Sequence, residues 1–146
     1  MGSSWYFRTI LNPSPELAGE VIEGLHRFNL AELGKEVVFN YHSVLVRAEA
    51  ADGSLIGGIR GELAWDWLRI KDFWVAEDHR GQGVGTRLLQ EIETAALSRD
   101  FAHSHLETTD FQGLGFYLKN GYEIFGELPG KPAGHRWYFL KKDLRP

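Results

Sequence analysis

The 146-residue sequence contains no cysteine. Disulfides, thiolate metal sites and a cysteine nucleophile are therefore excluded. The sequence also lacks a long apolar run and a signal peptide, so we expect a cytoplasmic protein with no membrane partner. An excess of basic residues is missing as well, since the net charge is −4. This charge argues against nucleic acid as the main partner.

What is present has the composition of an ordinary globular chain. Hydrophobic residues make up 43% of the sequence and charged residues 25%. The length is typical of one domain, which we expect to cover residues 1–146, and it is sufficient for a hydrophobic core. No internal repeat or low-complexity segment divides the chain.

A glycine loop at residues 80–85 is the most informative stretch, and it reads Arg-Gly-Gln-Gly-Val-Gly. An apolar strand-like run enters this loop, and an amphipathic helix leaves it. Glycines allow the backbone to approach a ligand closely, because no Cβ stands in the way. The start of a helix offers unpaired N–H groups and the positive end of the helix dipole. The stretch therefore predicts an anion site, most naturally for a phosphate.

The pattern of the loop narrows the choice of phosphate ligand. A dinucleotide fingerprint would need a third glycine at position 86, which is Thr86, and a P-loop would need a lysine that is absent. The sequence Arg80-x-x-Gly83-x-Gly85 instead resembles the acetyl-CoA pyrophosphate loop of the GCN5-related N-acetyltransferases (GNAT). The other reading is a plain glycine-rich turn between a strand and a helix.

Apolar periodicity predicts the remaining elements. We expect strands at residues 5–10, 41–48, 55–64, 67–75, 103–109 and 122–128 and a last strand ending near residue 140, with helices after residue 14, at 30–35, after the glycine loop and at 111–120. The order is β-α-α-β-β-β-α-β-α-β-β. Strand, helix and strand around the loop form a βαβ unit, so these two strands should run parallel and bind ligands at their carboxyl ends. The prediction is a single-domain, GNAT-like α/β (α+β) fold with a mixed, twisted sheet of about seven strands and helices on both faces.

The strand before the loop changes phase. Leu68 and Ile70 lie on one face, whereas Phe73 and Val75 lie on the other, so a β-bulge is expected at residues 71–73. A simple strand end is the alternative. In the family that the loop resembles, free backbone groups at such a bulge hold the pantetheine arm and point the acetyl carbonyl.

A second pattern, residues 115–122, resembles another signature of the same family, in which an aromatic-tyrosine pair precedes a glycine-aromatic pair. The resemblance extends over residues 67–140, whereas the N-terminal part fits only by the order of its elements. It implies that Tyr117 is the general acid, because a phenol with a pKa of about 10 is protonated at neutral pH. One departure is Asp110, which stands where the family often has a pantetheine-binding asparagine; Gln112 could take over that contact.

The resemblance implies acetyl-CoA as the cosubstrate and direct transfer to an amine in a ternary complex. The residues expected to bind acetyl-CoA are Phe73, Trp74, Val75, Arg80, Gly81, Gln82, Gly83, Val84, Gly85, Thr86, Gln112 and Phe116. The base is left open between His135, which a Pro-Gly loop delivers to the last strand, Asp72 at the bulge, and a water relay. Glu62 and Asp66 are weaker candidates.

The acceptor is expected to be a small free amine rather than a protein lysine. A non-catalytic acyl-CoA-binding or sensing domain and a nucleotide-binding module are the rival functions. A metal site formed by His42, His103 and His105 is rejected, because no ligand spacing supports it, and no metal is expected. The last strands of such folds often pair between two subunits, so the resemblance allows a homodimer.

Overall fold

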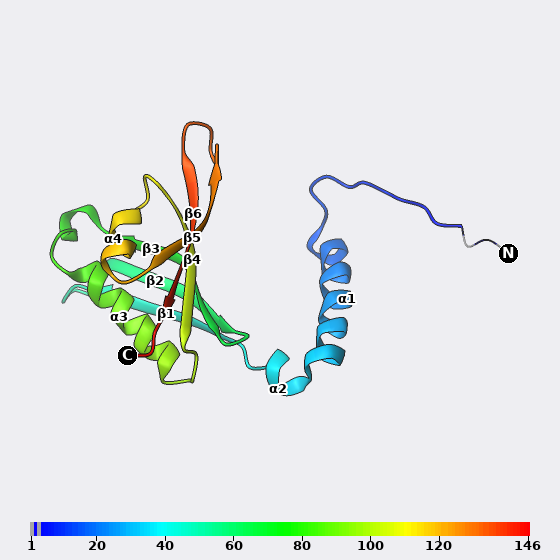
Figure 1. The fold of residues 1–146 in the computed structure, drawn as a ribbon, viewed down its shortest axis with the longest axis horizontal. Helices are drawn as coiled ribbons and strands as arrows, with labels where there is room; N and C mark the ends of the chain where they lie inside the picture. Colours follow the sequence, from blue (N-terminus) through cyan, green and yellow to red (C-terminus); the bar gives the residue numbers. More distant parts are fainter. Residues whose placement is uncertain (1, 3) are drawn as a thin grey trace. The chain divides into compact units, whose positions relative to one another are not determined.

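The computed structural model describes residue 2 and residues 4–146. The chain divides into two compact units, residues 1–38 and residues 39–146, called unit 1 and unit 2 below (Figure 1). The expectation of a single domain stays a prediction. Within the described part of the chain, no helix is both long enough and apolar enough to cross a membrane.

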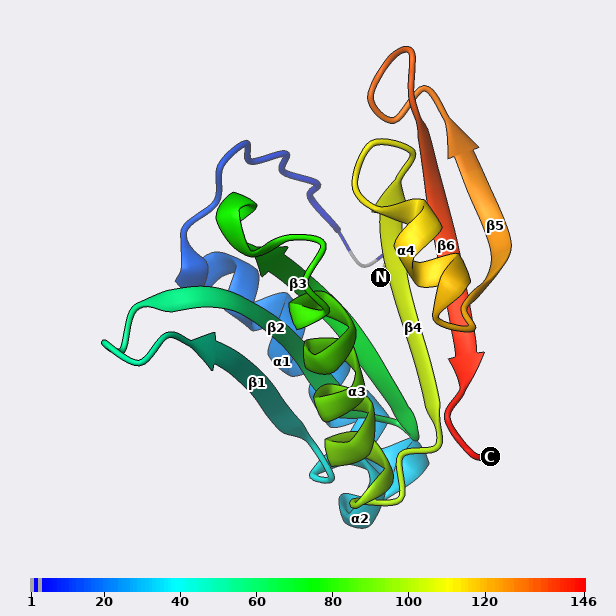
Figure 2. The same ribbon diagram turned by 90° about the vertical axis from the view of Figure 1, so that its left-hand side faces the viewer.

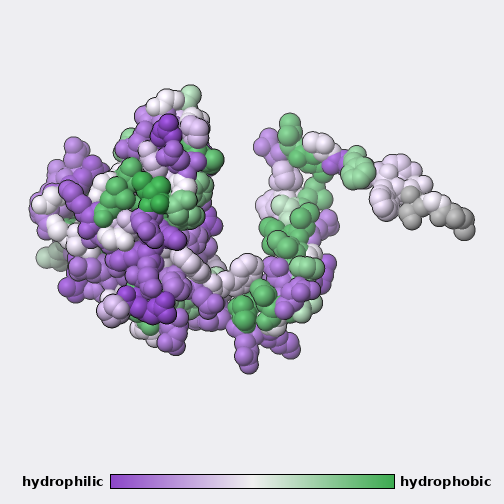
Figure 3. All heavy atoms as spheres, viewed as in Figure 1, coloured by the Kyte–Doolittle hydropathy of each residue, from purple (hydrophilic) through white to green (hydrophobic). Residues whose placement is uncertain are grey.

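Unit 1 contains the helices α1 (Pro15–Leu33) and α2 (Lys35–Val38). The Ser14 hydroxyl accepts a hydrogen bond from the Leu17 amide at 3.3 Å, which confirms the predicted start of the first helix. Apolar side chains gather along α1 (Figure 3), but no residue of either helix is buried. The two helices therefore have no core of their own.

Two predictions for the N-terminal segment are wrong. Residues 5–10 do not form a strand, since a strand is stabilised by a ladder partner and none of the described strands pairs with them. The first helix also continues to Leu33, past the residue where a second helix was expected to begin. Gly34, with φ 81°, follows α1, and α2 begins one residue later.

Unit 2 is built on a six-stranded sheet with the order β1-β2-β3-β4-β6-β5, one strand fewer than predicted (Figure 2). The strands are β1 (His42–Glu49), β2 (Leu55–Ala64), β3 (Trp67–Val75), β4 (His103–Thr109), β5 (Glu123–Pro129) and β6 (Arg136–Asp143). The pair β3 and β4 is parallel, and the other neighbouring pairs are antiparallel. The mixed α/β fold and the parallel βαβ unit are confirmed.

The helices of unit 2 are α3 (Val84–Leu97) and α4 (Leu114–Lys119), and a short 3-10 helix, Glu77–His79, precedes the glycine loop. Figure 2 shows α3 and α4 on the same face of the sheet, α3 over β2 and β3 and α4 beside β4 and β6. Leu89 and Ile92 of α3 are at most 1% exposed and form the core with Ile59 and Leu68 of the sheet. Helices on the second face of the sheet would have to come from residues 1–38. The expectation of helices on both faces therefore stays a prediction.

The parallel strands β3 and β4 pair only along their first halves. The ladder runs from Trp67 opposite His103 to Ile70 opposite Leu106 and then stops. Beyond these residues the strands diverge (Figure 2). The backbone groups of the second half of β3 that would bond to β4 are therefore available to something else.

An extra residue in β3 accompanies this divergence. Arg60 of β2 lies opposite Asp72, but the next residue, Gly61, lies opposite Ile70, so that Lys71 is left over. The predicted bulge is thus confirmed. Glycine is required at position 61, because a Cβ there would lie 2.7 Å from a backbone oxygen of β3.

Candidate active site

The glycine loop joins the end of β3 to the start of α3. Gly81 and Gly83 have φ angles of 72° and 85°, which side-chain-bearing residues rarely adopt. Gly83 is the N-cap residue of α3, and no side chain caps the helix there. The first amides of α3 are therefore left for an external anion, as the loop pattern predicted.

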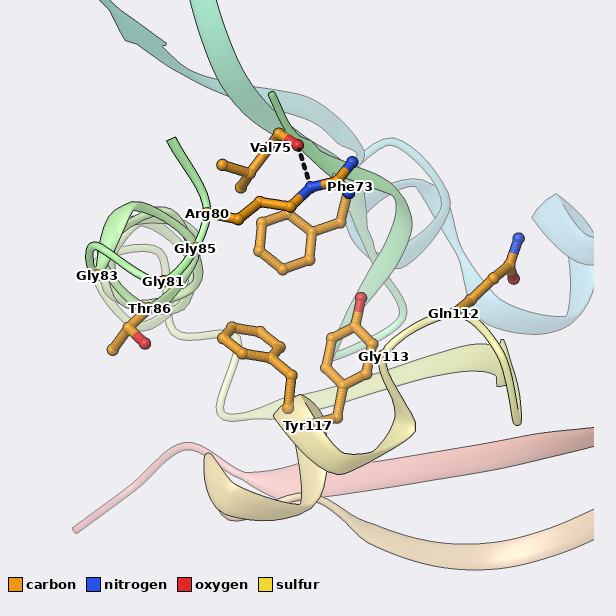
Figure 4. A pocket seen from close by; sticks show the side chains of 11 residues that line it. Phe73, Val75, Arg80, Gly81, Gly83, Gly85, Thr86, Gln112, Gly113 and Tyr117 are labelled. Atoms are coloured by element: carbon orange, nitrogen blue, oxygen red, sulfur yellow. Dashed lines mark hydrogen bonds between the residues drawn. The ribbon is translucent and has the colours of Figure 1, made fainter. Parts of the chain in front are cut away.

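Arg80 adds a positive charge beside these amides. Its Nε atom donates a hydrogen bond to the Val75 carbonyl oxygen at 2.9 Å, which ties the side chain to the end of β3 (Figure 4). The terminal guanidinium nitrogens have no protein partner in the described part of the chain. They can therefore bind a phosphate group without breaking an existing ion pair.

A cavity of about 320 Å³, called the loop pocket, lies against this loop. Most residues predicted to bind the cofactor line it, together with Gly113 and Tyr117: Phe73, Val75, Arg80, Gly81, Gly83, Gly85, Thr86, Gln112 and Phe116. Three predicted residues do not. Trp74 lines the adjoining cavity, and Gln82 and Val84 line a hollow beside β1 and α3.

Tyr117 stands in the wall of the loop pocket. Its side chain is 6% exposed, and its ring packs among those of Phe73, Phe116 and Tyr122 at centroid distances of 5.5 to 6.2 Å. In Figure 4 the hydroxyl points away from α4 toward β3. Burial raises the pKa of Tyr117 to about 12, so that the phenol stays protonated at any physiological pH.

A second cavity, of about 600 Å³, opens between the diverging ends of β3 and β4 and is called the bulge pocket. It shares with the loop pocket the residues Phe73, Val75, Arg80, Gln112, Gly113 and Tyr117. Its other lining residues are Lys71, Asp72, Trp74, Glu107, Thr108 and Phe111. The two cavities therefore meet at Tyr117, so that one ligand in each could react there.

Two charged groups of the bulge pocket already have partners of opposite charge. The Asp72 carboxylate accepts a hydrogen bond from Arg60 Nε at 2.7 Å. Lys71 Nζ donates to the Glu62 carboxylate at 2.9 Å, and this hydrogen bond lowers the pKa of Glu62. Both pairs cross between β2 and β3, so they fix the bulge from the side of the neighbouring strand.

Glu107 is a site residue that sequence reasoning missed. One oxygen of its carboxylate accepts a hydrogen bond from Trp137 Nε1 at 3.2 Å, and no cation pairs with it among the described residues. No motif marks this residue. Its position was the available signal, because Glu107 is an acidic residue near the carboxyl end of a parallel strand, and ligands bind at that edge of such sheets.

His135 lies outside the lining of both pockets. Its Nδ1 atom lies 2.9 Å from Oδ1 of Asp110, and its ring meets that of Phe111 edge-on at 4.7 Å between centroids. Phe111 itself lines the bulge pocket. His135 thus contacts a lining residue of the bulge pocket but does not line the pocket, where the predicted base would act.

The histidines considered for a metal site have aromatic neighbours instead. His103 stacks on Trp67 at 4.9 Å, His105 meets the same ring at 5.6 Å, and His42 lies 6.4 Å from Phe101. In the part of the chain that the structure describes, no group of three or more histidine or acidic side chains could hold a metal ion.

Known proteins resemble this chain in sequence and in fold. A family model described as an acetyltransferase (GNAT) domain matches residues 40–124. Blasticidin-S acetyltransferase of Streptomyces morookaense is 38% identical over 94 residues, which are 63% of this chain and 68% of that protein. An acetyltransferase from Bacillus cereus ATCC 14579 aligns with a TM-score of 0.85 at 29% identity, over 93% of this chain and 97% of that one. A putative streptothricin acetyltransferase from Bacillus anthracis str. Ames, solved with acetyl coenzyme A, shares the fold with a TM-score of 0.63 at 23% identity, over 74% of this chain and 66% of that one.

Proposed function

The chain belongs to the GNAT acetyltransferase family, and from this premise we propose that it transfers the acetyl group of acetyl-CoA directly to the amine of a small molecule. The observation that carries the proposal is the position of Tyr117 in the wall that the loop pocket and the bulge pocket share. Acetyl-CoA would occupy the first and the amine the second. Chemistry at Tyr117 then needs no covalent enzyme intermediate.

The loop pocket has the features that a pyrophosphate requires. The uncapped first amides of α3 and the free end of the Arg80 guanidinium supply hydrogen bonds and positive charge. The backbone groups of β3 beyond residue 70 that face β4 have no ladder partner there, and they would bind the pantetheine arm and polarise the thioester carbonyl. Acetyl-CoA supplies the acetyl group as a thioester, and these residues hold and orient it.

The transfer replaces a carbon–sulfur bond by a carbon–nitrogen bond. The amine nitrogen, with its lone pair free, attacks the thioester carbonyl, and the bond to sulfur breaks. The thiolate that leaves receives a proton or a hydrogen bond from the phenol of Tyr117, which its raised pKa of about 12 keeps protonated.

The bulge pocket favours a small cationic acceptor. Its volume of about 600 Å³ lies within the range usual for small-molecule sites. An ammonium group about 4 Å from the Glu107 carboxylate would gain roughly 1 to 4 kcal/mol, depending on how much water remains between them. Among the described residues no cation forms an ion pair with Glu107, so its carboxylate is open to an ammonium group.

The amine must also lose a proton before it attacks, and the candidates for the base differ in position. Glu107 lines the bulge pocket without a cationic partner, so we propose that it takes the proton directly or through water. Asp72 lines the same pocket but is paired with Arg60. His135 does not line the pocket and only contacts its lining residue Phe111, which makes it the less favourable candidate.

The proposal is tested by following thiol release from acetyl-CoA in the presence of different amines. The panel includes blasticidin S, a streptothricin, an aminoglycoside and L-methionine sulfoximine, which related proteins are named for, together with a lysine peptide. We expect thiol release that depends on one small amine class and is lost for Tyr117→Phe. If calorimetry shows acetyl-CoA binding but no amine is acetylated, the alternative of a sensing domain is correct.

A further inference from the structure

Asp110 and His135 form a pair beside Phe111, a lining residue of the bulge pocket, although neither of the two lines that pocket. We propose that the pair is a latch that holds Phe111 in the pocket wall, so that both residues position the wall against which the acceptor binds. The inference rests on the proposed function in one respect, namely that the bulge pocket takes the amine. It assigns His135 a positioning role in place of the base.

The latch joins two loops that are distant in sequence. Oδ1 of Asp110 lies 2.9 Å from Nδ1 of His135, and Oδ2 accepts a hydrogen bond from the Arg136 amide at 3.3 Å. The Asp110 amide in turn donates to the Arg136 carbonyl oxygen at 3.2 Å. Backbone and side chain together therefore fasten the β4–α4 loop to the first residues of β6.

His135 is itself held from the other side. Its amide donates to the Pro132 carbonyl oxygen at 3.0 Å, and its carbonyl oxygen accepts from the Gly130 amide at 2.8 Å. These bonds close the β5–β6 turn around the histidine. Because a carboxylate can only accept, the hydrogen on Nδ1 must be donated to Asp110. Of the two neutral tautomers, only the one with its hydrogen on Nδ1 can make this hydrogen bond. The ring also forms a T-shaped pair with that of Phe111.

Phe111 needs such a support. Its side chain is 57% exposed, so the core does not hold it. Among the described residues, His135 provides the only ring that contacts it, at 4.7 Å between centroids. Gln112 and Gly113, which follow directly, line both pockets. A movement of the loop at Asp110 would consequently displace the wall of the acceptor site.

A positioning role and a catalytic role predict different kinetics. If His135 were the base, His135→Gln would lower kcat, and the loss would change with pH. If it acts through Phe111, the same variant raises the KM for the acceptor about five- to tenfold and leaves kcat within about twofold, because only binding is weakened. The KM for acetyl-CoA should stay unchanged in both cases.

Asp110 supplies the conservative control. Asp110→Ala removes the acceptor of the histidine hydrogen bond and should raise the acceptor KM by a similar factor. Asp110→Asn keeps one side-chain oxygen that can accept from Nδ1 but loses the second acceptor, which the Arg136 amide uses, so we expect it to restore only part of the affinity. Glu123→Ala, which removes an exposed ion pair with Lys141 at the other end of the β5–β6 hairpin, should change neither constant.

The kinetics are measured with blasticidin S as the acceptor probe, and nitrogen-15 NMR of the histidine rings provides a test that needs no acceptor. The wild-type protein should show His135 as the Nδ1–H tautomer, and Asp110→Ala should abolish this preference. A crystal structure of Asp110→Ala with coenzyme A should show Phe111 displaced. An Nε2–H tautomer in the wild type, an unmoved Phe111 or a loss confined to kcat would overturn the latch. If blasticidin S is not acetylated, the acceptor assignment fails, and the latch is decided by the NMR spectra and the crystal structure.

Discussion

Replacing Tyr117 by phenylalanine removes a single oxygen atom from the wall that the two pockets share. We expect kcat to fall about 10²-fold, which corresponds to roughly 2.7 kcal/mol of lost transition-state stabilisation. This value is the lower end of the range for a general acid, because a thiolate is a good leaving group and water can enter the open pocket. No hydrogen bond to the hydroxyl contributes to its raised pKa, and none joins it to another of the described residues, so its loss breaks no hydrogen bond of the protein.

The same geometry predicts little effect on folding. The ring of Tyr117 would keep its contacts with Phe73, Phe116 and Tyr122, and the free energy of unfolding should change by less than about 0.5 kcal/mol. Thermal unfolding and calorimetric titration with coenzyme A measure stability and affinity separately from turnover. An unchanged kcat, with both controls intact, would refute the general-acid role. A protein that no longer folds would instead refute the packing argument.

The pH profile provides an independent check on Tyr117. Its pKa is raised to about 12 by burial, above the ordinary value of about 10. The active, protonated phenol should therefore persist, and the rate should not fall between about pH 8 and pH 10 through ionisation of this group. A decline centred near pH 10 in the wild type that is absent from the phenylalanine variant would contradict this assignment of the pKa.

Three further predictions concern the loop, the core and the acceptor. Gly83→Ala places a side chain at φ 85° and should weaken coenzyme A binding by up to about tenfold. The control Gly53→Ala has the same φ in the β1–β2 turn and equally open surroundings, and it should leave binding unchanged. Equal coenzyme A affinities of the two variants in calorimetric titrations would oppose a role of the loop backbone. Tyr122→Phe leaves the Ser104 hydroxyl, which is 0% exposed, without the hydrogen bond that joins it to the Tyr122 hydroxyl at 2.8 Å. The free energy of unfolding, measured with denaturant, should therefore fall by about 1 to 3 kcal/mol. An unchanged unfolding midpoint would mean that water replaces the hydrogen bond. Glu107→Gln should lower kcat/KM for a cationic amine about tenfold or more at neutral pH, and unaltered steady-state rates would exclude it as the base.

Local sequence patterns were sufficient to predict the backbone geometry of the glycine loop and of the strand before it. The glycine loop, the helix after it and the phase change between Ile70 and Phe73 each involve neighbours in the chain, so periodicity and backbone preference determine them. The family resemblance located Tyr117 by the same kind of local pattern. Most of these groups line one cavity of unit 2, the loop pocket, and their roles stay a prediction.

Long-range pairing explains what the sequence did not predict. Glu107 lines the bulge pocket because β4 diverges from β3, and Asp110 meets His135 because β4 and β6 are paired over residues that are 25 or more positions apart. No local pattern encodes either contact. The prediction of a strand at residues 5–10 was wrong for the same reason, since a strand depends on a partner elsewhere in the chain.

The two halves of the site consequently differ in how substitutions can change them. In the proposed function the loop pocket would bind its ligand largely through the backbone amides of the glycine loop, which side-chain changes on the strands leave in place. The bulge pocket is formed by side chains from β3, from β4 and from the β4–α4 loop. Substitutions at Asp72, Trp74, Glu107 or Phe111 should therefore change which amine is accepted while affinity for coenzyme A is retained. A set of such variants whose acceptor preference never changes independently of coenzyme A affinity would show that the two pockets are one energetic unit.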